Sequence, residues 1–87
     1  MRKIRVLTVD DNVRILELYD ELLKKDTEIE HVGRAEDGVE AVKKIKELQP
    51  DVVLLDIIMP KLDGIGVLEQ IRQDTELTKQ PRVIVVT

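Results

Sequence analysis

The run Val52-Val53-Leu54-Leu55-Asp56 carries the strongest fold signal in this chain of 87 residues. Four consecutive apolar residues are typical of a strand that is buried on both faces, as the central strands of parallel sheets are. Asp56 stands where this strand ends. The run therefore predicts a parallel sheet with an acid at the carboxyl end of one central strand.

Segments of two kinds alternate on either side of this run, which is typical of a parallel sheet with crossover helices. We expect the order β-α-β-α-β-α-β. The segment 31–35 is short and carries His31 and Arg34, so we place it at an edge of the sheet and expect His31 to be exposed. The expected strands are 3–9, 31–35, 52–55 and 82–86, and the expected helices are 13–25, a second that begins after the cap Asp37 and ends at Pro50-Asp51, and 64–73.

Apolar residues at helical spacing predict which face of each helix is buried. Asp11 or Asn12 is available to cap the first helix. The residues expected to face the core are Ile15, Leu18, Tyr19, Leu22 and Leu23 in the first helix, Ala41, Val42, Ile45 and Leu48 in the second, and Val67, Leu68 and Ile71 in the third.

Length and composition exclude several classes of protein. A chain of 87 residues forms one domain with one core, and this one has no cysteine and a single aromatic residue, Tyr19. It contains no apolar run long enough for a signal peptide or a membrane span, so we expect a soluble cytoplasmic protein. The net charge is −4 and the basic residues are scattered among acids, which argues against direct binding of nucleic acid.

Three acids follow two of the predicted strands. Asp10 and Asp11 come after the first strand, and Asp56 ends the third. Because the carboxyl ends of parallel strands meet at one edge of a sheet, we expect these carboxylates to lie close together and to repel one another. A hard divalent cation removes that repulsion, and the donor set suits Mg²⁺, which Mn²⁺ or Ca²⁺ could replace. Taken singly, each acid could equally be a helix cap or the start of a loop.

Three segments carry a resemblance to a known family, namely Val9-Asp10-Asp11-Asn12, Ala35-Glu36-Asp37-Gly38-Val39-Glu40-Ala41 and Leu54-Leu55-Asp56-Ile57-Ile58-Met59-Pro60-Lys61-Leu62-Asp63-Gly64. Over essentially its whole length the chain is similar to a bacterial response-regulator receiver domain. The resemblance implies a flavodoxin-like (CheY-like) α/β fold, with three α/β/α layers and a parallel sheet of strand order 2-1-3-4. Residues 56–69 also resemble the sporulation-initiation regulator of endospore-forming bacilli.

The resemblance further implies a role in two-component signal transduction. Asp56 would accept a phosphoryl group from a phosphohistidine on a histidine kinase or phosphotransferase, so the module would be regulatory rather than an enzyme. Asp11 would bind Mg²⁺ directly, Asp10 through water, and Ile58 through its backbone carbonyl. Thr87 would bond a phosphoryl oxygen through its hydroxyl, although as the last residue it could equally be a frayed terminus.

The chain departs from the family at its end. A complete receiver has five strands and five helices, and residues 1–87 would be the N-terminal portion of one such domain, lacking the fifth strand and the last two helices. The absent part holds the family's phosphoryl-binding Lys, so activity as an acceptor is in doubt. Residues 83–86 would also form an uncovered apolar edge. The alternative is therefore an inactive fragment that folds and self-associates into a homo-oligomer through this strand.

Two other classes of function fit the sequence less well. A phosphatase of the haloacid-dehalogenase type also uses an Asp nucleophile at a strand end, but it needs a second Asp two residues later, where this chain has Ile58. A nucleotide-binding domain needs a glycine-rich loop after the first strand, and the acids at residues 10 and 11 would repel phosphate instead.

Overall fold

The computed structural model describes residues 2–56, 64–74 and 80–86. The seven predicted elements are present in the predicted order. They are β1 (Ile4–Val9), α1 (Val13–Lys24), β2 (Ile29–Ala35), α2 (Gly38–Leu48), β3 (Val52–Leu55), α3 (Gly64–Gln73) and β4 (Arg82–Val85).

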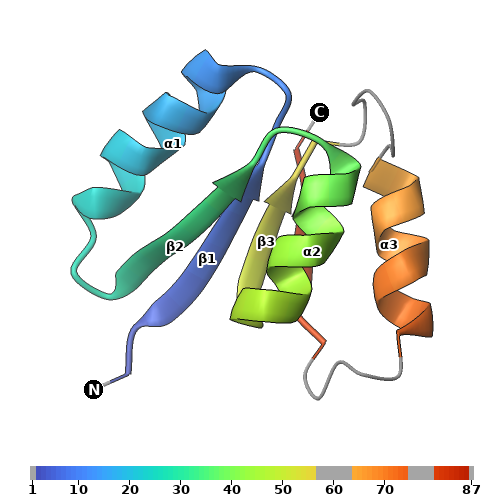
Figure 1. Cartoon of the computed structure of the whole chain (residues 1–87). Coiled ribbons are helices and arrows are strands. Elements are labelled where there is room, and N and C mark those ends of the chain that lie inside the picture. Colours follow the sequence, from blue (N-terminus) through green and yellow to red (C-terminus); the bar gives the residue numbers. More distant parts are fainter. Residues whose placement is uncertain (1, 57–63, 75–79, 87) are drawn as a thin grey trace.

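The four strands form one parallel sheet in the order β2-β1-β3-β4 (Figure 1), which confirms the predicted flavodoxin-like, CheY-like topology. Alternate residues of β1 face opposite sides of this sheet. Leu7 and Val9 belong to a buried cluster with residues of α2 and α3. Thr8 points to the other side, where it meets a residue that also contacts α1. The sheet is therefore the middle of three layers.

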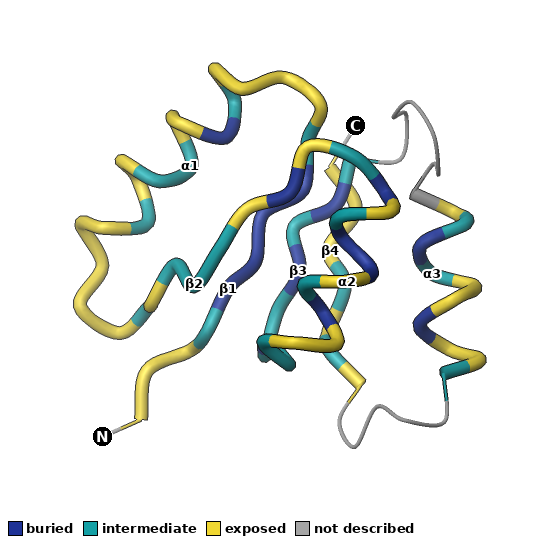
Figure 2. Tube along the Cα trace, viewed as in Figure 1, coloured by how far each residue is buried: buried dark blue, intermediate teal, exposed yellow. Residues whose placement is uncertain are grey.

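Burial follows this arrangement. β1 is buried along most of its length, and α2 and α3 are buried on the side that meets the sheet (Figure 2). β4 lies at the edge of the sheet, and its Ile84 and Val85 keep 52% and 44% of their surface exposed. In the part of the chain that the structure describes, no helix combines the length and the apolar character needed to cross a membrane.

Polar contacts fix the helix ends. Asn12, rather than Asp11, caps α1 by accepting a hydrogen bond from the backbone N–H of Arg14 at 3.0 Å. Asp37 caps α2 as predicted, accepting from Glu40 N–H at 2.8 Å. α2 ends at Leu48, and the residue after it, Gln49, has a φ of 44°, which is the left-handed conformation.

The first strand is tied to the end of α2 and the start of β3. The Arg5 guanidinium donates to the carbonyl oxygens of Leu48 and Gln49, at 2.7 and 3.2 Å. Asp51 accepts from the Arg5 backbone N–H at 2.8 Å and pairs with exposed Arg2. These bonds satisfy the last carbonyls of α2 and fix β1 next to β3.

The predicted inner face of α1 is partly wrong. Leu18 and Leu22 are 48% and 54% exposed, whereas Leu16, which the prediction left out, is fully buried. α1 packs mainly against β2, with fewer contacts to β1. The apolar face of α1 is wider than the part of the helix that contacts these two strands. The buried part of that face is centred on Leu16, and the apolar residues at its margin stay exposed.

The expectation that His31 is exposed is also wrong. Its side chain is only 6% exposed. β2 is an edge strand in its hydrogen bonding, but α1 lies across one face of it. A strand can therefore have a free edge and a covered face at once, and His31 lies on the covered face.

Candidate functional site

The three acids follow two neighbouring strands and lie at the same edge of the sheet. β1 and β3 are paired in parallel with Val9 opposite Leu55, so Asp10 and Asp56 follow the last residues of the two strands. The Asp56 N–H donates to the Val9 carbonyl at 3.0 Å, and the Asp10 N–H donates to the Ala35 carbonyl of β2 at 3.1 Å. The backbone on both sides of the site is thus fixed by the sheet.

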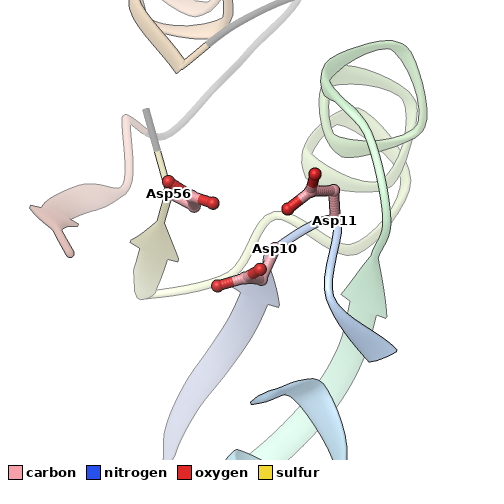
Figure 3. A group of neighbouring side chains, drawn as sticks. All are labelled: Asp10, Asp11 and Asp56. Carbon is pink, nitrogen blue, oxygen red and sulfur yellow. The ribbon is translucent and has the colours of Figure 1, made fainter. Parts of the chain in front are cut away.

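The carboxylates converge as the sequence predicted. Asp10, Asp11 and Asp56 each offer an oxygen, and these oxygens all lie within 4.8 Å of one another. Figure 3 shows the three side chains around a common space, Asp56 from the end of β3 and the other two from the end of β1. Asp10 and Asp56 are half-buried and Asp11 is exposed, so the cluster opens to solvent on the Asp11 side.

Crowding alters the electrostatics of the cluster. Burial raises the pKa of Asp10 above its ordinary value, and the charges of Asp56 and Asp11 raise it further. The Asn12 N–H, which donates to Asp10 Oδ1 at 2.9 Å, opposes the rise. The site therefore resists holding three negative charges and would gain from a bound cation.

The donor set fits a hard divalent cation. Carboxylate oxygens are the ligands that Mg²⁺ prefers, and one or two protein carboxylates with water and substrate oxygens complete its usual octahedron. The half-buried acids Asp10 and Asp56 lie on the sheet side of such an ion, and Asp11 lies at the start of the connection to α1.

Two of the predicted site residues, Ile58 and Thr87, lie outside the described residues. The residue before Thr87 lies close to the acidic site. Val86 N–H donates to the carbonyl of Leu55 at 2.8 Å, so β4 ends beside the residue that precedes Asp56.

Tyr19, which the sequence analysis assigned only to the core, is influenced by the charges of the site. Burial raises the pKa of its phenol, and the charges of Asp10 and Asp56 raise it further. The phenol therefore lies within electrostatic reach of both acids. The signal was present in the sequence, because side chains of a helix lean toward its N-terminus, and α1 begins next to the acidic pair.

A model of the family described as response regulator receiver domain matches residues 6–87. The chain belongs to this family. Receiver domains are regulatory modules of two-component systems, and the acidic cluster at the ends of β1 and β3 is consistent with that membership.

Individual receivers resemble the chain closely. A protein-glutamate methylesterase/protein-glutamine glutaminase from Methanospirillum hungatei is 43% identical over 84 residues, which are 97% of this chain and 24% of that protein. The response regulator domain of CheB from Thermotoga maritima superposes with a TM-score of 0.87 at 40% identity, covering 97% of this chain and 60% of that one. CheY in a CheX–CheY–BeF₃–Mg²⁺ complex from Borrelia burgdorferi gives a TM-score of 0.81 at 37% identity, with coverages of 97% and 61%.

These relatives do not support the narrower resemblance to a sporulation-initiation regulator, because three curated proteins that are 43–46% identical to the chain have methylesterase names. That resemblance rested on residues 56–69 alone, a short segment that overlaps the one quoted for the resemblance to receivers in general. The chain spans about a quarter or less of the length of those curated relatives.

Proposed function

We propose that this receiver accepts a phosphoryl group on Asp56 from the phosphohistidine of a histidine kinase or phosphotransferase in the cytoplasm, with Mg²⁺ held by Asp10, Asp11 and Asp56. One observation carries the proposal. In a chain that belongs to the receiver family, the three acids of two adjacent strands place carboxylate oxygens within 4.8 Å of one another. The complex of the Borrelia burgdorferi neighbour includes Mg²⁺ by name.

In the proposed transfer, an Asp56 carboxylate oxygen attacks phosphorus. The P–N bond of the phosphohistidine breaks and its electron pair goes to the ring nitrogen, so the imidazole leaves as a neutral ring that keeps the proton on its other nitrogen. An acyl phosphate forms on Asp56. Bound Mg²⁺ would neutralise charge on the phosphoryl oxygens. The backbone of Asp56 has a fixed position, because its N–H donates a hydrogen bond to the Val9 carbonyl and β3 is paired with a strand on each side.

Asp10 and Asp11 have different places in this proposal. Exposed Asp11 would bind the ion directly, and Asp10 would reach it through water while accepting the Asn12 N–H. We further propose the Ile58 carbonyl as an ion ligand and the Thr87 hydroxyl as a phosphoryl contact. The position of β4 supports the role of Thr87, since the N–H of Val86 donates a hydrogen bond to the carbonyl of Leu55, the residue before Asp56.

We also propose that residues 1–87 form the N-terminal portion of a single receiver domain. The solved receivers that match it are longer, since the chain covers 60% and 61% of two of them. The exposed apolar side chains of edge strand β4 favour a second behaviour, self-association of two copies through that strand.

Labelling with acetyl phosphate in the presence of Mg²⁺ tests the proposal. We expect one phosphoryl group per chain, detected by intact mass and mapped to Asp56, and no labelling of the Asp56→Asn variant or of the chain with excess chelator. Failure to label a folded chain that binds Mg²⁺ would refute acceptor activity and favour the self-association module.

A further inference from the structure

A polar network lies on the α1 side of the sheet, apart from the acidic cluster; Thr8 and the His31 side chain are buried, and Asp20 is partly exposed. His31 of β2 lies between Thr8 of β1 and Asp20 of α1. Its Nε2 is 2.9 Å from the Thr8 hydroxyl oxygen and its Nδ1 is 2.9 Å from Asp20 Oδ1. Thr8 is fully buried, so no substrate can reach its hydroxyl, and the row of Thr, His and Asp is not a catalytic triad.

The direction of these hydrogen bonds follows from the charge on Asp20. The bond to His31, followed by that to Lys24 at 3.0 Å, holds the pKa of Asp20 below its ordinary value. An ionised carboxylate only accepts, so Nδ1 of His31 must carry a proton. In a neutral ring Nε2 is then an acceptor, and the Thr8 hydroxyl donates to it. Each buried polar group of the network has a partner in this arrangement.

The network connects the two elements, β1 and α1, that flank Asp10 and Asp11. Thr8 lies two residues before Asp10 in β1, and Asp20 lies in α1, which begins directly after Asp11 and Asn12. Leu16 is the one fully buried residue of α1, and its other inward-facing apolar residues are only half-buried. Hydrogen bonds from one histidine to both elements therefore restrict how the connection between them can move.

We propose that His31 is a positioning residue of the cation site: through Thr8 and Asp20 it fixes α1 against β1, and so holds Asp11 where it can share an ion with Asp10 and Asp56. The inference rests on the proposed function, since it assumes that these acids bind a divalent cation. His31 itself does not touch the site.

The test is a Mg²⁺ titration of the whole chain and its variants, followed by backbone amide NMR shifts at Asp11 and Asp56. Thr8→Val removes the hydroxyl with almost no change of shape. Asp20→Asn removes the charge but keeps an oxygen that accepts from Nδ1–H, whereas Asp20→Ala removes both. We expect Thr8→Val and Asp20→Ala to weaken Mg²⁺ binding by roughly fivefold, at the low end of couplings between separate sites, and Asp20→Asn to retain most of the affinity.

A control variant separates positioning from loss of stability. Ile45→Val removes one buried methylene group from the core on the opposite face of the sheet and should lower stability without changing Mg²⁺ affinity. The ¹⁵N shifts of the His31 ring give an independent readout, and we expect a proton on Nδ1.

The possible results are distinct. Equal Mg²⁺ affinity in the unmodified chain, Thr8→Val and Asp20→Ala would overturn the inference alone, as would a His31 ring without a proton on Nδ1. No Mg²⁺ binding by the unmodified, folded chain would refute the proposed function and the positioning role together.

Discussion

The backbone N–H of Asp56 donates to the carbonyl oxygen of Val9 at 3.0 Å, and Val9 is the residue before Asp10. The acid at the end of β3 is therefore fixed by a ladder bond to the strand that supplies its two acidic neighbours. A cation or phosphoryl group that binds between Asp10 and Asp56 therefore contacts two side chains whose backbones are already held by the sheet, so little backbone entropy at these two residues is lost on binding.

The raised pKa of Asp10 has a consequence for stability. Its carboxyl is easier to protonate in the fold than in the unfolded chain, so its favourable contribution is full below the ordinary value of 3.8 and is lost as pH rises through the folded-state value. We expect Asp10→Asn to stabilise the metal-free chain at neutral pH by up to about 1 kcal/mol, after allowance for solvent screening. Urea unfolding from pH 3 to pH 7 measures this, and a gap between the two proteins that does not widen with pH would contradict it.

Arg5 should contribute to stability without affecting the acidic site. Arg5→Met keeps the apolar stem but leaves the carbonyls of Leu48 and Gln49 without their charged donor, which should cost about 1–2 kcal/mol in unfolding free energy. Arg2→Met is the matched control, because Arg2 forms an exposed ion pair and should cost less than about 0.5 kcal/mol. Equal losses in the two variants would show that the cap of α2 is not stabilising.

The packing of α1 can be tested with two leucines of the same helix. Leu16→Ala should lower the unfolding free energy by about 2–4 kcal/mol, because it leaves a cavity under the helix. Leu18→Ala, at a position that is 48% exposed, should change it by less than about 0.5 kcal/mol. Thermal or denaturant unfolding compares them, and the reverse ranking would mean that α1 is rotated from the orientation described.

The proposed self-association through β4 predicts the effect of a charge on that strand. Ile84 is 52% exposed, so Ile84→Lys should leave the fold intact and raise the dissociation constant of the dimer by at least about tenfold. Sedimentation velocity across a range of concentrations measures this. A monomeric unmodified chain at every concentration would exclude the self-association that the variant is meant to weaken.

The sequence predicted best those features that depend on local pattern. The bounds of β3 and α3 were predicted correctly, because a run of four apolar residues ending in Asp56 and a helix beginning at Gly64 have clear limits. The acidic cluster was predicted from a topological rule, since acids that follow adjacent parallel strands must meet. Its geometry is confirmed by the structure, while the role of each acid stays a proposal.

Features that depend on how the helices pack on the strands were predicted less well. Leu16, rather than Leu18, is buried because α1 lies mainly over β2, and no periodicity within the helix contains that information. His31 was expected to be exposed because its strand is at an edge, yet burial depends on the face of a strand as well as its edge. Its partners, Thr8 and Asp20, are 23 and 11 residues away in sequence.

Tyr19 is the only aromatic residue of the chain, and its phenol lies within electrostatic reach of Asp10 and Asp56. The near-ultraviolet absorption and fluorescence of the protein therefore come from a single chromophore whose pKa responds to the charges of the acidic cluster. A change of charge in the cluster is expected to perturb the phenol, so the unlabelled protein contains its own optical reporter of what is bound there.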